Sequence, residues 1–257
     1  MSTLFLGTLA TLVFCAPGYP GASADAQPFL DQFASAAVSA AGWPAGSLAA
    51  VYDPTEEGGL SKLGNSDAVL AFVPYPFFVE HAVQLHLSPL VQANVSGTGT
   101  QQRWTLVAKS GRVSGAASLS GFTIVSVAGY APDFVRHSVL DGWTLTADVR
   151  IEQTGQILSA LRKVAAGDNL VALLDQTQAG AIGTLPFAAD LKPVFQSAPL
   201  PVALIAVVDS RLPAARARSL QAALLKMRRE PGANDALASL RLDGFILPQL
   251  PVHTAGQ

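Results

Sequence analysis

A glycine turn between an apolar strand and a helix is the part of this sequence best suited to hold an anion. The segment 126–132 reads SVAGYAP, in which Ser126 follows an apolar run and Pro132 stands near the first turn of a helix. Bare backbone N–H groups at such a junction bind phosphates and carboxylates. Val127 and Ala128, however, stand where hydroxyl groups would add hydrogen bonds. The expected ligand contacts from this turn are Ser126, Ala128, Gly129 and Tyr130.

Polar side chains stand at two further strand-to-helix junctions. Asp175 follows the apolar run NLVALL and precedes the helical segment 176–185. Its carboxylate can accept a hydrogen bond from a ligand hydroxyl or can cap the N-terminus of that helix, and both interpretations stay open. Thr154 and Gln156, on either side of Gly155, present the same choice between capping and ligand binding.

Aromatic, proline and glycine residues gather in loops that follow the strands of the first half. The carboxyl ends of strands face the crevice of an open α/β sheet, so a ligand is expected beside these loops. Flat aromatic faces suit an apolar ligand, although a phenylalanine at such a position also packs readily in a core. The expected contacts are Pro17, Gly18, Tyr19, Tyr75, Phe77 and Trp104.

The sequence carries no sign of catalysis, metal binding or nucleic-acid binding. Cys15 is the only cysteine, so no disulfide forms within the chain, and its apolar surroundings favour a buried thiol. The four histidines lack metal-ligand spacing, and neither a metal nor another cofactor is expected. There is no G-x-S-x-G, Walker or S-x-x-K motif, and a net charge of −2 gives no attraction to nucleic acid. We therefore expect a binding protein rather than an enzyme.

Alternating strand and helix patterns predict an α/β fold for the 257-residue chain. Apolar runs at 11–15 and 47–52 are separated by helical periodicity, and the same alternation starts again near residue 104. Short apolar strands between helices indicate parallel sheets covered on both faces. The last helical pattern is expected to continue through Phe245.

The repeated alternation divides the chain into two predicted lobes. Residues 1–105 and 201–257 form a discontinuous first lobe, and residues 106–200 form an inserted second lobe. The two chain crossings that bracket the insertion make a hinge, so the architecture is two-lobed with a hinged interlobe cleft.

The N-terminal segment imitates a secretory signal without meeting its requirements. It lacks a positively charged start, and Pro17-Gly18 and Pro20-Gly21 interrupt the apolar stretch. We interpret Thr11–Cys15 as a buried first strand. No other run approaches the roughly 18 apolar residues that a membrane helix needs, so no membrane span is expected.

Several segments match, in order, the motifs of one protein family. SVAGYAP resembles an S-T-S-G-Y-x-x-P loop at Ser126, Gly129 and Tyr130, and AAGDNLVALLDQTQ resembles a G-x-x-D-x-A-x-x-D-S segment, with Asp175 at the second acidic position and Gln176 in place of serine. SDAVLAFVPYPFFVEH and RLPAARARSLQAALLKM keep the same order along the chain. These motifs resemble those of the phosphate/phosphonate-type periplasmic substrate-binding proteins, which have the type II periplasmic-binding-protein fold.

The resemblance implies a non-enzymatic receptor that closes its lobes around a small molecule and delivers it to a membrane transporter. It also implies a monomer in the periplasm, with the leader peptide missing from the sequence as given. In the family, hydroxyls of the loop hold phosphonate oxygens, and an aspartate at the position of Asp175 holds a ligand amine.

Departures from the family pattern bear on the ligand. Without hydroxyls at Val127, Ala128 and Gln176, each phosphonate oxygen left unpaired costs about 1–3 kcal/mol. We therefore expect a substantially apolar ligand, lipid-like or sterol-like, in the interlobe cleft. The alternative is a phosphonate or phosphate-ester receptor of an ABC importer, in which backbone amides hold the anion.

Overall fold

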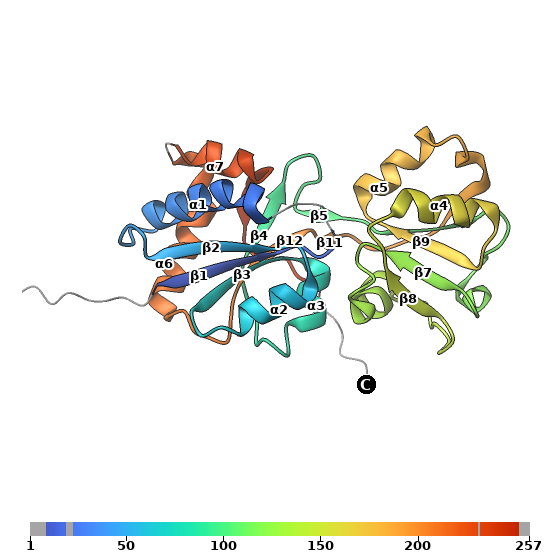
Figure 1. Cartoon of the computed structure of the whole chain (residues 1–257), viewed down its shortest axis with the longest axis horizontal. Helices are drawn as coiled ribbons and strands as arrows, with labels where there is room; N and C mark the ends of the chain where they lie inside the picture. The colour runs from blue at the N-terminus through green and yellow to red at the C-terminus, as the bar shows by residue number, and fades with distance from the viewer. Residues whose placement is uncertain (1–8, 19–22, 231, 252–257) are drawn as a thin grey trace, which may run out of the picture.

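Two sheets, each with its own helices, make up the protein, and two stretches of chain connect them (Figure 1). The computed structural model describes residues 9–18, 23–230 and 232–251. We call the unit built on the six-stranded sheet lobe one and the unit built on the five-stranded sheet lobe two. The α/β, two-lobed fold expected from the sequence is confirmed.

The sheet of lobe one has the strand order β13-β4-β12-β3-β1-β2. Strands β1, β2 and β3 run parallel, whereas β12 is antiparallel to both β3 and β4, and β13 is antiparallel to β4. Its strands are β1 (Ala10–Cys15), β2 (Leu48–Asp53), β3 (Ala68–Pro74), β4 (Ser88–Val95), β12 (Ala203–Val207) and β13 (Leu242–Ile246).

Helices cover both faces of this sheet because its strands alternate apolar side chains to either side. Leu12 and Phe14 pack with α1, α6 and α7 on one face, while Val13 and Cys15 pack with α2 and α3 on the other. The helices are α1 (Ser23–Ala40), α2 (Glu56–Gly64), α3 (Tyr75–His81), α6 (Ala214–Lys226) and α7 (Ala233–Ser239).

The sheet of lobe two has the order β10-β6-β9-β7-β8, with β7, β8 and β9 parallel and β6 antiparallel to both neighbours. Helix α4 packs on one face, and the π-helix η2 packs on the other. The elements are β6 (Thr105–Lys109), β7 (Thr123–Ser126), η2 (Phe134–Val139), β8 (Arg150–Gln153), α4 (Ile157–Ala166), β9 (Leu170–Leu174), α5 (Gln176–Ala181) and β10 (Leu191–Gln196).

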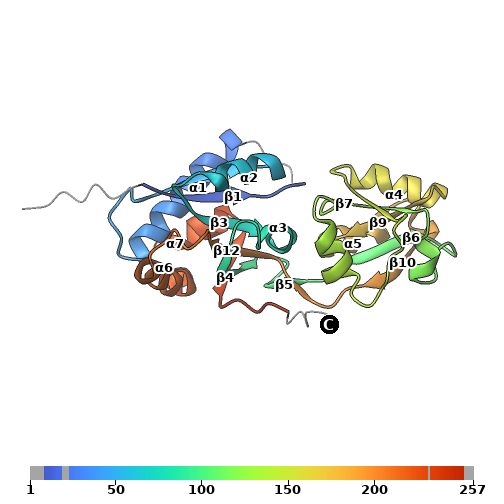
Figure 2. The ribbon, with the colours of Figure 1, turned by 90° about the horizontal axis from the view of Figure 1, so that it is seen from below.

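The two connections between the lobes lie side by side and are tied together. The short strands β5 (Gln101–Gln102) and β11 (Leu200–Pro201) pair antiparallel. Beyond them, the backbone of Trp104 donates to Ser197 Oγ at 3.0 Å, and Ser197 N donates to Trp104 O at 2.9 Å. Both views show this pair of crossings between the sheets (Figures 1 and 2).

Two details of the sequence prediction were wrong. The sheets are mixed rather than parallel, because β4, β12 and β13 return through antiparallel pairings. The last helix ends at Ser239, and the expected helical residue Phe245 belongs to β13. Gly244 adopts φ +135°, a positive value that glycine tolerates and that a right-handed helix does not contain, and pairing with β4 outweighs the local helical pattern.

Candidate functional site

The turn after β7 is fixed by its own hydrogen bonds and by contact with β8. Ser126 is fully buried, and its Oγ accepts from the backbone N–H of Ala128 at 3.1 Å. A Cβ atom at Gly129 would lie 2.2 Å from the carbonyl oxygen of Glu152, so only glycine fits there. The turn is therefore a rigid backbone element, and Tyr130 follows it half-buried.

The apolar side chains of this turn pack against protein rather than against an open cavity. Val127 and Ala128 are 4% and 2% exposed and belong to a hydrophobic core to which both lobes contribute. On the facing side, a Cβ atom at Gly18 would lie 2.5 Å from the carbonyl oxygen of Val127, and Gly18 has φ +84°. The missing hydroxyls thus reflect contact between the lobes, which weakens the inference that they signal an apolar ligand.

Three of the aromatic residues expected at the ligand lie in the same interlobe core. Tyr75, Phe77 and Trp104 are each at most 2% exposed. The ring of Phe134 from η2 packs edge-on against Trp104, with centroids 5.4 Å apart, and against Tyr75 at 6.0 Å. Burial raises the pKa of Tyr75 to about 12, so its hydroxyl stays protonated. The contacts of Phe134 with Tyr75 and Trp104 join lobe two to lobe one and to the connection between them.

A cavity of about 770 Å³ lies between the two lobes. We call it the interlobe cavity. The ends of β1 and β3 and the turn after β4 form the wall from lobe one, and the start of α5 forms the wall from lobe two. The lining residues are Phe14, Cys15, Ala16, Tyr52, Phe72, Val73, Pro74, Val95, Ser96, Gly97, Thr98, Gln102, Asp175, Thr177, Gln178, Val202, Ala203, Leu240 and Arg241.

Asp175 both lines this cavity and caps a helix. Its Oδ1 accepts from Gln178 N at 2.8 Å, and Gln178 Oε1 accepts from Asp175 N at 3.2 Å, which completes a capping box at the start of α5. The side chain is 5% exposed. The capping interpretation that the sequence left open is thus observed, and the carboxylate also faces the cavity.

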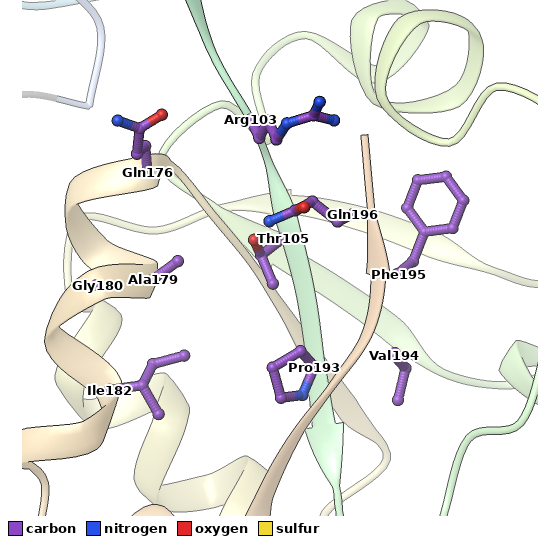
Figure 3. A pocket seen from close by; sticks show the side chains of 10 residues that line it. All are labelled: Arg103, Thr105, Gln176, Ala179, Gly180, Ile182, Pro193, Val194, Phe195 and Gln196. Carbon is purple, nitrogen blue, oxygen red and sulfur yellow. The ribbon is translucent and has the colours of Figure 1, made fainter. Parts of the chain in front are cut away.

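The remaining expected contacts lie apart from the interlobe cavity or beyond the described chain. Thr154 Oγ1 accepts from Gln156 N at 3.1 Å at the entry to α4. Gln176 turns to a separate groove on lobe two (Figure 3). Pro17 is buried directly after the cavity-lining end of β1, and Tyr19 lies outside the described residues.

Two charged residues near the cleft escaped the sequence prediction. Glu80 in α3 accepts a hydrogen bond from the backbone N–H of Asp133 at 3.0 Å, so a carboxylate of lobe one sits at the start of η2 in lobe two. Burial raises the pKa of Glu80 above its usual value, despite that hydrogen bond. Arg241 lines the interlobe cavity from the turn between α7 and β13. Neither position carries a motif, because each acquires its role only through tertiary contact.

The thiol at the cavity wall has the properties of a structural cysteine. Cys15 is fully buried and its Sγ donates to Thr55 O at 3.4 Å. Burial, with the nearby charges of Asp53 and Glu56, raises its pKa to about 12, so it is not a nucleophile at neutral pH. In the described ranges, no three histidine, cysteine or carboxylate side chains gather as a metal site, and no helix is long and apolar enough to cross a membrane.

Two mixed sheets joined by paired crossings, with a cavity between them, define the class of two-lobed periplasmic binding proteins. XAC2383 from Xanthomonas citri, bound to ATP, is 18% identical with a TM-score of 0.67, covering 94% of this chain and 92% of that one. A binding component of an ABC phosphonate transporter from Pseudomonas aeruginosa is 16% identical with a TM-score of 0.55, over 92% and 81% of the two chains. PhnD1 from Prochlorococcus marinus, in complex with methylphosphonate, is 10% identical with a TM-score of 0.53, over 94% and 93%.

The family itself follows from the sequence match. The model described as "ABC transporter, phosphonate, periplasmic substrate-binding protein" matches residues 62–250. The chain belongs to this family, whose role is to bind substrate for a transporter and not to catalyse a reaction. No match was found among the curated proteins. The resemblance read from the sequence is confirmed, and a lipid-like ligand gains no support from it.

Proposed function

We propose that this chain binds a phosphonate or phosphate ester in the interlobe cavity and delivers it to an ABC importer. Membership of the family supports the ligand class, and a volume of about 770 Å³ suits a small molecule with an organic substituent. The observation that carries the proposal is Arg241, the one cationic residue among the described residues that line this cavity.

The guanidinium group of Arg241 is placed to bind an oxyanion of the ligand. Its side chain is exposed, and within the described ranges it has no acidic partner. Its backbone is anchored, since Ser96 N donates to Arg241 O at 2.8 Å. A guanidinium group binds phosphate oxygens through two parallel N–H bonds, and the hydroxyls of Thr98 and Thr177 stand along the same cavity.

The start of η2 is the less favourable place for the oxyanion. Glu80 Oε2 already accepts from Asp133 N there, at 3.0 Å. A phosphonate beside that carboxylate would face like charge in a partly buried region, which costs free energy. Anion binding by the backbone amides of this junction alone therefore requires Glu80 to move or to be protonated.

The organic part of the ligand would contact the apolar wall from lobe one. Phe14, Phe72 and Val95 line the cavity together with Leu240, while Asp175 offers a carboxylate from the opposite lobe. An ester with an apolar or aromatic substituent fits a cavity with one apolar wall and one cationic residue better than inorganic phosphate does. The similar protein from Xanthomonas citri, bound to ATP, also holds a phosphate ester.

Isothermal titration with a small panel tests the proposal: methylphosphonate, 2-aminoethylphosphonate, phenyl phosphate and palmitate. We expect saturable binding of at least one phosphorus compound and none of palmitate. Arg241→Gln should weaken that binding by about tenfold or more, as expected for loss of a charge-assisted pair. Arg218→Gln, an exposed arginine on α6, is the matched control.

Two results would overturn parts of the proposal. Binding of palmitate without binding of any phosphorus compound would restore the apolar ligand. Wild-type affinity in a folded Arg241→Gln variant would mean that Arg241 does not hold the oxyanion.

A further inference from the structure

A second cavity lies on lobe two, outside the interlobe cavity and beside the connections between the lobes. It has a volume of about 700 Å³ and runs between α5 and the strand pair β6 and β10 (Figure 3). We call it the hinge groove. Its lining comes from Arg103, Thr105, Gln176, Ala179, Gly180, Ile182, Pro193, Val194, Phe195 and Gln196.

One end of the hinge groove is polar and cationic. Arg103, Gln176 and Gln196 line that end, where the Arg103 guanidinium points toward the end of β10 and the Gln196 amide points toward Thr105 (Figure 3). Arg103 is the only charged residue among the described residues of the lining. Arg103, Gln176 and Gln196 are all exposed, so solvent and small solutes reach this end of the groove.

The guanidinium group is held in place but retains free donors. Arg103 Nη1 donates to Ser197 O at 2.7 Å, across the two connections between the lobes. A guanidinium has five N–H groups in a fixed plane, so this bond orients it and leaves the others for a ligand. A planar carboxylate matches such a fork with two parallel hydrogen bonds.

The other end of the groove is apolar. Ala179 and Ile182 extend from α5 toward β10, and Pro193 faces them from that strand (Figure 3). Phe195 turns to the opposite side, where its ring packs against Trp143 with centroids 4.9 Å apart. The floor therefore offers a short hydrocarbon-binding surface continuous with the polar end.

The hinge groove is separate from the interlobe cavity although both use α5. Thr177 and Gln178 line the interlobe cavity, whereas Gln176, Ala179 and Gly180 line the groove. The two cavities thus use different residues of one helix.

We propose that the hinge groove binds a small amphipathic carboxylate, with its carboxylate on Arg103 and its hydrocarbon tail along Ala179, Ile182 and Pro193. The single cation and the absence of carboxylates in the described lining favour a monoanion, and the few apolar residues of the lining, Ala179, Ile182 and Pro193 among them, suit a short tail. This site is independent of the ligand proposed for the interlobe cavity.

Titration calorimetry with octanoate tests the site, with 1-octanol as the uncharged control. We expect saturable octanoate binding that 1-octanol does not reproduce. Arg103→Gln should weaken it by about tenfold or more, and Arg103→Lys, which keeps the charge but loses the fork, should weaken it by less. Arg150→Gln, an exposed arginine on β8, should bind octanoate as the wild type does.

Several outcomes would overturn the proposal. The wild type would show no saturable octanoate binding, a folded Arg103→Gln variant would bind octanoate with unchanged affinity, or 1-octanol would bind as well as octanoate. Each of these results would contradict the site. Loss of octanoate binding in Arg241→Gln, or its competitive displacement by a phosphonate, would place octanoate in the interlobe cavity instead. The octanoate measurements can still be interpreted if no phosphonate or phosphate ester binds, because they depend on Arg103 and not on Arg241.

Discussion

The carboxylate of Glu80 and the backbone N–H of Asp133 form a hydrogen bond of 3.0 Å between the two lobes. Glu80 belongs to α3 of lobe one, and Asp133 directly precedes η2 of lobe two. The partial positive charge at a helix start favours a carboxylate, so this contact helps to hold the lobes together. It also puts a protein carboxylate at the junction whose sequence is suited to an anion, the alternative to the apolar ligand expected there.

Glu80→Gln should flatten the dependence of thermal stability on pH. Burial raises the pKa of Glu80, which means that the folded protein binds this proton more tightly than the unfolded chain does. The contribution of the group to stability is therefore present below the ordinary carboxyl pKa and is lost as pH rises through the raised value. Thermal unfolding between about pH 4 and pH 8 measures the effect.

The exposed Glu57 of α2 supplies the control for this experiment. Glu57→Gln should keep the wild-type pH profile. A Glu80→Gln variant whose melting temperature follows the wild type across the whole range would show that the Glu80 proton is not linked to folding.

Phe134→Ala should lower stability strongly, because the ring fills the core between the lobes. Phe134 is fully buried and packs on Trp104 and Tyr75. Truncating a buried phenylalanine costs about 3–5 kcal/mol through lost burial and the cavity left behind. Urea unfolding gives the free energy, and tryptophan emission reports the changed surroundings of Trp104. The matched variant Phe29→Ala, at a residue 46% exposed on α1, should change little.

Periodicity predicted most elements of the fold because local signals and tertiary packing agree along them. The apolar run at 11–15 became β1, and a capping box at Asp175 opens α5 as the sequence allows. Leu242 and Phe245 illustrate the limit: their spacing suits a helix face, but β4 presents an open edge and they pair with it as β13.

The site was harder to predict than the fold. Tyr75, Phe77 and Trp104 follow strands, as ligand-contacting loop residues do, yet all three are buried in protein contacts. No pattern in one sequence distinguishes an aromatic ring that faces a ligand from one that faces the other lobe. Arg241 could not be identified as a cavity residue from the sequence, because its position depends on the contact between the turn before β13 and the end of β4.

Asp53→Asn should destabilise the protein at neutral pH by about 1–3 kcal/mol, the cost of disturbing a buried charge-assisted network. Burial alone would raise the pKa of Asp53, but hydrogen bonds from Lys62 and Thr55 outweigh it and lower the pKa below its usual value. The stabilisation is therefore present above the ordinary carboxyl pKa and is lost as pH falls through the lowered one.

Thermal unfolding at neutral and acidic pH tests this sign. The difference between wild type and Asp53→Asn should shrink as the solution is acidified. Asp141→Asn, at an exposed residue, should show no such difference at either pH. A gap between wild type and Asp53→Asn that widened in acid would contradict the assignment.

Gly129→Ala should destabilise lobe two because the new methyl group has no room. Its Cβ would lie 2.2 Å from Glu152 O and 2.5 Å from Gln153 N, both backbone atoms of β8 that cannot rotate away. Overpacking of this kind costs about 1–3 kcal/mol, which lowers the melting temperature of a chain of this size by several degrees. Gly155→Ala, where no atom lies within 4 Å of the added Cβ, separates steric conflict from the general effect of replacing glycine. Equal melting temperatures for the two variants would mean that β8 shifts to accept the methyl group and that the turn after β7 is less rigid than its contacts indicate.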